Sequence, residues 1–334
     1  MASIDEVARM AGVSTATVSR ALSGRGQVSA ATRARVQSAA SALGYVVSSR
    51  ASSLASGRTR NIGVIVPFLD RWFFSTVLSG LSAAAMRQGY DITLYNITAD
   101  RAVRREVFDT FLRRQRVDAV IAVSIKLDDD ETQRLLGLGL PVVAIGGPHP
   151  RLDTLMVDEV AVGRAATAHL LQLGHRMIGH IGASPEFDGD FRVPTQRREG
   201  FEQALAGAGL APEPTLLELA DFTIEGGYRA ATRMLARPGV RPTAVFAASD
   251  EMAIGAMLAA RDRGLRVPED LSVIGVDGHE LGAFFQLTTV DQFPLGQGER
   301  AADAVCARLA DPDAARGPII LPSALTVRGS TAAL

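Results

Sequence analysis

The chain has 334 residues, of which 47% are hydrophobic and 21% are charged, which fits a globular protein of two or three domains. A single cysteine, Cys306, excludes an intrachain disulfide, and no apolar run is long enough to cross a membrane. The net charge of −1 hides an asymmetry, because residues 1–60 carry eight arginines but only Asp5 and Glu6, which leaves the remainder at −7. A basic head on an acidic body predicts that only the head contacts a polyanion. The N-terminus shows no apolar signal segment, which predicts a cytoplasmic protein.

Residues 3–22 predict two short helices joined by a tight turn. Ser3 and Glu6 form a capping box for the first helix, Gly12 permits a left-handed turn, and Ser14 can cap the second helix. The second helix exposes small or polar residues and one arginine, namely Thr15, Ala16, Thr17, Ser19 and Arg20. An ordinary helical hairpin would expose more Glu and Lys. The pattern therefore favours a helix-turn-helix, whose second helix enters the DNA major groove.

A third helix is expected from after Ser29 to about Leu43, closing an all-α domain over residues 1–46. The Ser- and Arg-rich segment 47–60 separates this domain from the rest and is either a flexible linker or a hinge. As a hinge it would form a short helix around Leu54, and a helix that short needs a partner copy and a DNA surface to fold.

From residue 61 to residue 334 the sequence alternates between apolar strands and amphipathic helices. Strands are expected at 61–66, 91–95, 117–123, 141–145, 177–182, 243–248 and 271–276. Helices are expected near 74–88, 101–115, 129–138, 160–173, 195–208, 225–236, 251–263 and 297–310. Apolar strands separated by helices indicate parallel sheets covered on both faces. The number of units favours two doubly wound lobes over a single sheet or a barrel.

Aromatic, hydroxyl and carboxylate side chains gather just beyond the strand ends, where such sheets bind ligands. They include Asp70, Phe73, Phe74, Ser124, Phe222, Ser249, Asp250 and Asp277. Aromatic faces cover the apolar patches of a polyhydroxylated ligand, and carboxylates accept hydrogen bonds from its hydroxyls. Taken singly, each acid could be a helix cap and each phenylalanine a core residue. The coincidence at several strand ends predicts a binding site.

The chain resembles the LacI/GalR (lactose repressor) family of bacterial transcriptional regulators over essentially its whole length. The matching segments are residues 4–22, 28–36, 43–45, 157–158, 169–175, 197–201, 249–253, 276–278, 287–290 and 328–330. The resemblance implies two lobes of periplasmic-binding-protein type and a homodimer whose two heads read a near-palindromic operator.

Residue roles follow from the same resemblance. Bases would be contacted by Thr15, Ala16 and Arg20, and phosphates by Ser3, Ser14, Thr17, Ser19, Ser23, Ser29, Thr32 and Tyr45. Leu54 corresponds to the hinge leucine that wedges into the minor groove. The cleft between the lobes would be lined by Phe73, Phe74, Ser124, Arg197, Phe222, Ser249, Asp250 and Asp277.

The sequence departs from the family pattern at three places. Val47-Ser48 replace the usual Pro-Asn, Ser52 replaces a frequent hinge arginine that Arg50 could substitute for, and Ser249 replaces a common asparagine. No leucine-heptad tail follows residue 330, which favours a dimer over a tetramer. The expected subunit interface is on the helices near 74–88 and 251–263, although ordinary packing would also explain their small residues.

The predicted function is a repressor of sugar-utilisation genes that is controlled by a small carbohydrate, with no cofactor and no metal. The alternatives are a regulator that responds to a nucleobase or another metabolite and, from other classes, a sugar-processing enzyme or a transport binding protein. No Gly-x-Ser-x-Gly elbow or Walker loop is present, which argues against an enzyme. The missing signal peptide argues against a transport protein. The sequence indicates neither the identity of the sugar nor whether it releases or favours DNA binding.

Overall fold

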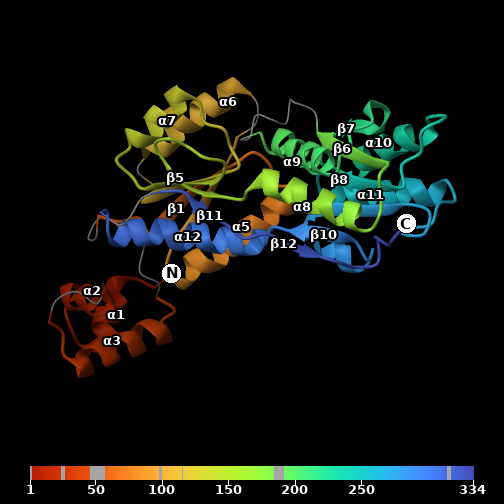
Figure 1. Ribbon diagram of the computed structural model, residues 1–334. Helices are drawn as coiled ribbons and strands as arrows, with labels where there is room; N and C mark the ends of the chain where they lie inside the picture. Colours follow the sequence, from red (N-terminus) through yellow and green to blue (C-terminus); the bar gives the residue numbers. More distant parts are fainter. Residues whose placement is uncertain are drawn as a thin grey trace. The chain divides into compact units, whose positions relative to one another are not determined.

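A computed structural model describes residues 2–23, 27–45, 57–97, 100–114, 116–183, 192–313 and 317–334 (Figure 1). The chain divides into two compact units, which are Met1–Asn61 with Gln115–Asp118, and Ile62–Arg114 with Ala119–Leu334. The first unit contains the helical head and the second contains both α/β lobes. The hinge residues Arg50 and Leu54 lie outside the described residues, so the expected hinge helix is not addressed by the structure.

The head is built from helices α1 (Ile4–Ala11), α2 (Thr15–Ser23) and α3 (Ala30–Ala42). The predicted capping box is present, because Ser3 Oγ accepts from Glu6 N while a Glu6 carboxylate oxygen accepts from Ser3 N. Gly12 is left-handed as predicted, with φ of 64°. The apolar core of the head centres on one valine from each helix, Val7, Val18 and Val36, each 0% exposed.

Lobe 1 is a six-stranded sheet in the order β11-β5-β4-β3-β1-β2. Its strands are β1 (Asn61–Val66), β2 (Asp91–Asn96), β3 (Ala119–Val123), β4 (Val142–Gly146), β5 (Asp153–Met156) and β11 (Ile319–Ile320). The helical segments that accompany it are α5 (Trp72–Arg87), α6 (Arg101–Glu106), a π-turn (Val107–Phe111), a 3₁₀ turn (Leu112–Arg114), α7 (Asp129–Leu136) and α12 (Pro294–Ala310). The pairings of β1 with β3, β3 with β4, and β4 with β5 are all parallel.

Lobe 2 repeats this strand order in a second six-stranded sheet, β12-β10-β9-β8-β6-β7. Its strands are β6 (Ile178–Ala183), β7 (Leu217–Ala220), β8 (Ala244–Ala247), β9 (Ser272–Asp277), β10 (Thr288–Asp291) and β12 (Ala324–Thr326). Its helices are α8 (Glu159–Gln172), α9 (Val193–Gly207), α10 (Ile224–Ala236) and α11 (Asp250–Asp262). The β10–β12 pair is antiparallel, and the pairs β10–β9, β6–β7, β6–β8 and β8–β9 are parallel. The prediction of two doubly wound parallel lobes is confirmed.

The strand order reverses at equivalent places in the two lobes. In lobe 1 the reversal lies between β1 and β3, and in lobe 2 it lies between β6 and β8. Ligands of open α/β sheets bind at such a reversal, beyond the carboxyl ends of the strands. The chain passes between the sheets after β5, after β10 and between β11 and β12. The fold thus brings two sheet edges and the inter-lobe connections to one region.

Three helix pairs cross so closely that each partner has a glycine at the contact. The pairs α5–α12, α8–α9 and α10–α11 lie side by side (Figure 1). The glycines are Gly80 with Gly298, Gly163 with Gly200, and Gly227 with Gly255. A Cβ at Gly163 would lie 2.1 Å from Arg197 O, and one at Gly200 would lie 2.2 Å from Val160 O. The small residues of α5 and α11, expected on a subunit interface, are therefore used at least partly within the chain.

The predicted strands and helices are all present, with some differences. Residues 101–115 were expected as one helix, but the structure forms α6 only to Glu106 before the π-turn, where Val107 and Phe108 are buried. The short strands β5, β7 and β10 were not predicted as strands. Each has only four residues, which is too few to show a clear alternation.

Candidate functional site

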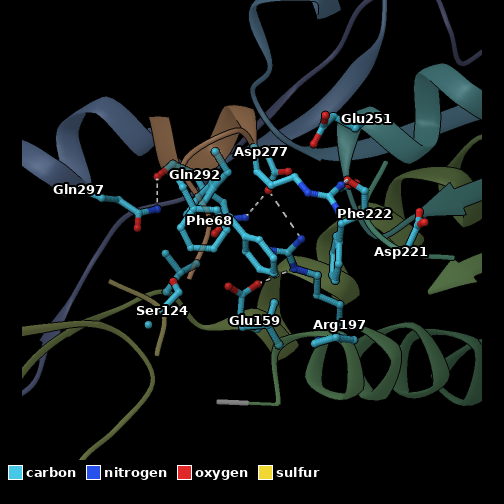
Figure 2. A pocket seen from close by; sticks show the side chains of 18 residues that line it. Phe68, Ser124, Glu159, Arg197, Asp221, Phe222, Glu251, Asp277, Gln292 and Gln297 are labelled. Carbon is cyan, nitrogen blue, oxygen red and sulfur yellow. Dashed lines mark hydrogen bonds and ion pairs between the residues drawn. The ribbon is translucent and has the colours of Figure 1, made fainter. Parts of the chain in front are cut away.

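A pocket between the lobes lies beyond the carboxyl ends of their strands. Lobe 1 and the connections to it contribute Phe68, Arg71, Phe73, Phe74, Ser124, Gly146, Val157, Gln292 and Gln297. Lobe 2 contributes Glu159, Val193, Pro194, Arg197, Asp221, Phe222, Ser249, Glu251 and Asp277. In Figure 2, Asp221, Phe222 and Glu251 group on one side, and Ser124, Gln292 and Gln297 on the other.

Aromatic rings form the lobe 1 side of the pocket. Phe74 packs edge-on against both Phe68 and Phe73, with ring centroids 5.6 Å apart in each pair. The Arg71 guanidinium lies 5.6 Å from the centroid of Phe68. These rings come from the loop after β1 and the first turn of α5, so the chain presents them together at the strand end.

A buried polar network crosses the pocket (Figure 2). Arg197, which is 4% exposed, donates from Nε to Glu159 Oε2 at 2.7 Å and also donates to Ala248 O. Its Nη1 lies 3.6 Å from Asp277 Oδ1, which accepts from Gln292 Nε2 at 2.8 Å. Glu159 is the first residue of α8, directly after the connection from β5, and Gln292 lies on the connection between β10 and α12, so the network joins both places to the pocket.

The pocket is acidic on balance. It is lined by four carboxylates, Glu159, Asp221, Glu251 and Asp277, and by two guanidinium groups, Arg71 and Arg197. Burial raises the pKa of Asp277 well above its usual range, and the nearby Arg197 opposes this only in part. Burial also raises the pKa of Glu251. Even with Asp277 protonated, the three other carboxylates outnumber the two guanidinium groups, and Arg197 is already paired with Glu159, so an anionic ligand would meet more negative than positive charge.

Three of the seven described non-glycine residues with positive φ line the pocket. The φ values are 46° for Ser124, 57° for Phe222 and 125° for Asp277. Positive φ is uncommon for residues other than glycine, because their Cβ clashes with the backbone. Each follows or ends a strand, and each lines the pocket. Such strain costs on the order of 1–3 kcal/mol per residue and is typical of functional sites.

The loop after β1 bridges the two lobes at the rim of the pocket. Arg71 Nη1 donates to Phe222 O at 3.2 Å. The next residue, Trp72, stacks on His279 with ring centroids 4.3 Å apart and planes inclined by 23°. Adjacent residues of one loop thus contact two separate loops of lobe 2.

Seven of the nine residues predicted for the ligand site line the pocket, namely Phe73, Phe74, Ser124, Arg197, Phe222, Ser249 and Asp277. Asp70 and Asp250 do not line the pocket, which differs from the expectation for these two residues. Asp70 is exposed on the loop. Asp250 is 0% exposed and turns inward, where its Oδ2 accepts from Gly278 N at 2.9 Å and from His279 N at 2.7 Å. That the seven bind a ligand stays a prediction.

Several lining residues were missed. Phe68, Arg71 and Asp221 were visible as neighbours of predicted residues at strand ends, and Glu251 adjoins Asp250. Glu159 directly follows one inter-lobe connection and Gln292 lies on another, and the sequence does not show these connections to be close in space. Arg197 was found only through the family resemblance.

The head exposes most of the side chains that were predicted to contact DNA. Ser14, Ala16, Ser19 and Arg20 are exposed, whereas Thr15 and Thr17 are half-buried. Arg20 Nε donates to Ala16 O at 3.2 Å, one turn earlier. The side chain of Ser23 lies outside the described part of the chain, and Tyr45 is half-buried against the head core.

Three of the predicted phosphate contacts are helix caps. The hydroxyl oxygens of Ser3, Ser14 and Ser29 accept from the amides of Glu6, Thr17 and Thr32, respectively. Helix N-termini favour anions, so a capping serine can serve both helix and phosphate. Thr32 Oγ1 also accepts from Ser29 Oγ at 2.9 Å.

Two features are absent from the described residues. Among them, no group of three His, Cys, Asp or Glu residues is arranged to hold a metal ion. Nor does any helix in this part of the chain have the length and apolar character needed to cross a membrane.

Comparison with known proteins adds to this geometry. The profile of bacterial regulatory proteins of the lacI family matches residues 3–48, and that of a periplasmic binding protein-like domain matches residues 167–331. The HTH-type transcriptional repressor PurR of Mannheimia succiniciproducens is 35% identical over 99% of this chain and 98% of its own length. A complex of the transcriptional regulator CelR with cellobiose superposes with a TM-score of 0.72, at 30% identity over 99% of this chain and 100% of that one. A Lac repressor dimer bound to operator and the anti-inducer ONPF gives a TM-score of 0.84, at 27% identity over 99% of both chains.

Proposed function

Because the chain belongs to the LacI family of bacterial transcriptional repressors, we propose that a neutral small carbohydrate bound between its lobes controls its binding to DNA. In this proposal the reading head is residues 1–46, the hinge is 47–60 and the ligand-binding body is 61–334. Two chains would form a homodimer, and their heads, with the segments around Leu54, would read a near-palindromic operator of sugar-utilisation genes.

The observation that carries the carbohydrate proposal is the composition of the pocket. Aromatic faces from Phe68 and Phe74 suit the apolar faces of a sugar ring. The carboxylates and the amides of Gln292 and Gln297 suit its hydroxyls, because they can accept and donate several hydrogen bonds. The solved CelR complex contains cellobiose, which supports a sugar in the equivalent fold.

The charge balance narrows the ligand class. Arg197 is held by Glu159 and lies near Asp277, so it offers no unmatched positive charge to a phosphate or carboxylate. A sugar phosphate or a nucleotide would therefore add negative charge to a pocket that already has an excess of it. We expect a neutral ligand.

A thermal-shift screen tests this proposal. The panel consists of cellobiose, glucose, galactose and ribose, with glucose 6-phosphate as the charged counterpart and cytosine and hypoxanthine as nucleobase alternatives. A ligand at one hundred times its Kd stabilises the folded state by about 2.7 kcal/mol, which is several degrees in melting temperature. We expect at least one neutral sugar to give such a shift and glucose 6-phosphate to give none.

Asp277→Ala is the matched variant for the same screen. It removes the carboxylate that joins Arg197 to Gln292, so the shift produced by the active sugar should disappear while operator affinity stays similar. An unchanged shift in Asp277→Ala would remove this residue from the site. A shift with cytosine or hypoxanthine alone would replace the carbohydrate by a nucleobase, whose flat ring the phenylalanines could also stack on. An equal shift with glucose 6-phosphate would contradict the charge argument.

A further inference from the structure

A single carboxylate holds the chain where it leaves the segment 46–58. Asp118, which is 9% exposed, accepts from Thr59 N at 2.7 Å and from Thr59 Oγ1 at 2.8 Å through one oxygen. Its other oxygen accepts from Arg60 N at 2.9 Å. Both oxygens of this buried carboxylate are therefore used by two residues that lie 58 and 59 positions earlier in the chain.

The backbone around this carboxylate is also fixed. Arg60 has a φ of 56°, a left-handed conformation that a residue with a side chain rarely adopts without support. The hydrogen bonds that the Thr59 and Arg60 amides donate to Asp118 provide that support, because they fix the backbone immediately before the Arg60 Cα. Asp118 N in turn donates to Asn61 O at 2.7 Å, at the start of the β1–β3 ladder. The direction of the chain at residues 59–61 is thus set by one side chain.

We propose that Asp118 is a positioning residue that fixes the body end of the hinge and so determines where the reading head can be placed. This inference rests on the proposed function, in which two heads of a dimer bind one operator together. The second head then binds at an effective concentration that depends on the length and direction of its tether. Release of Thr59 and Arg60 from Asp118 would lengthen the tether by these two residues and remove the direction that they give it.

The position of Asp118 in the chain connects this anchor to the ligand pocket. Asp118 immediately precedes β3, whose five residues are all buried, and Ser124 immediately follows that strand and lines the pocket. One short buried strand therefore has the anchor before it and a pocket residue after it. A shift of β3 on ligand binding would act on the residue that holds the hinge.

Specificity of DNA binding tests the proposal without knowledge of the effector. A duplex would first be enriched by the wild-type protein from a random library, and its affinity compared with that of a random-sequence duplex of equal length. In Asp118→Asn the carboxamide nitrogen cannot accept an amide hydrogen, so at least one anchor bond is lost. We expect the ratio of specific to non-specific affinity to fall at least fivefold, with non-specific affinity and melting temperature nearly unchanged. The matched control is Asp91→Asn, at the exposed first residue of β2, which should leave the ratio unchanged.

Hydrogen exchange and a second variant complete the test. The amides of Thr59 and Arg60 should exchange slowly in the wild type and rapidly in Asp118→Asn. If Asp118→Asn does not fold, Thr59→Val tests the proposal instead. It removes only the hydrogen bond from Thr59 Oγ1 to Asp118 and should lower the ratio of specific to non-specific affinity at least twofold. Rapid exchange of the Thr59 and Arg60 amides in the wild type would contradict the proposal that Asp118 anchors the hinge. An unchanged ratio of specific to non-specific affinity in a variant whose amides exchange rapidly would also contradict it. Failure to enrich any duplex would instead contradict the proposed function, and slow exchange of these two amides would still support the anchor.

Discussion

The buried carboxylate of Asp250 predicts a pH dependence of stability that can be isolated by mutation. Burial raises the pKa of Asp250 from 3.8 to about 6, and the amides of His279 and Gly278 oppose this only in part. A difference of about two pKa units corresponds to about 3 kcal/mol. Because the pKa is raised in the folded state, the folded protein binds more protons than the unfolded chain in this window. The contribution of Asp250 to stability is therefore present at low pH and is lost as the pH rises from about 4 to about 6.

His180 acts in the opposite direction over nearly the same window. It is 2% exposed, stacks against Phe201 and Phe246 at 5.0 and 4.9 Å, and contacts Phe246 O through Nδ1 at 3.0 Å. Burial lowers the pKa of His180 from 6.5 to about 4. The unfolded chain therefore binds the extra proton, and about 3 kcal/mol of stability is lost as the pH falls from 6.5 to 4. In the wild type the two slopes oppose each other.

Urea unfolding at pH 4.5, 5.5 and 6.5 would separate the two groups. Asp250→Asn removes the carboxylate, so the free energy of unfolding should rise with pH by about 1–3 kcal/mol more than in the wild type. His180→Phe removes the titrating imidazole but keeps a ring between Phe201 and Phe246. As the pH rises, the free energy of unfolding of this variant should therefore fall relative to that of the wild type. If both variants had the wild-type pH profile, neither group would titrate as its burial implies, and the reasoning would be refuted.

Two other predictions concern the pocket and its rim. Gly163→Ala places a Cβ against Arg197 O, so the α8–α9 crossing must open. Overpacking of this kind lowers the free energy of unfolding by about 1–3 kcal/mol, which thermal unfolding would show as a lower melting temperature. The control Gly207→Ala, in α9 with open space around it, should be neutral or slightly stabilising, and equal effects of the two would contradict the close crossing. Trp72 is the only tryptophan of the chain and stacks on His279, so a sugar that changes the angle between the lobes should change its fluorescence emission. This response should be lost in His279→Leu, and an emission that never changes with bound sugar would argue against a moving rim.

The fold could be predicted from the sequence because its signals are local. Capping at Ser3, the left-handed Gly12 and the alternation of apolar runs with amphipathic helices each follow from residues close together in the chain. The strand ends then located the pocket, because parallel strands bring their carboxyl ends to one edge. The reciprocal glycines at helix crossings could not be predicted, since a glycine in a helix shows nothing of the backbone that packs against it.

Prediction was weakest for the direction of individual side chains. Asp250 and Glu251 are adjacent acids at the start of α11, yet only Glu251 lines the pocket, while Asp250 holds the loop after β9. Likewise Asp70 is exposed while its neighbour Arg71 lines the pocket. Rotation by one residue at a helix start or in a loop reverses which side chain faces inward. Sequence therefore places the site to within a residue or two and leaves the contacts undetermined.

The contacts that join the lobes and those available to a ligand share the same residues. Phe222 lines the pocket with strained backbone and accepts the hydrogen bond from Arg71 across the lobes. Asp277, also strained, faces the pocket one residue before the loop in which His279 stacks on Trp72. A ligand that contacted Phe222 of lobe 2 and Phe74 of lobe 1 would therefore bind with different affinity when the lobes change their angle, since that change moves its two contacts relative to each other. Such differential affinity is the only means by which a ligand can shift a conformational equilibrium, and a ligand held by both lobes would have it without any additional element.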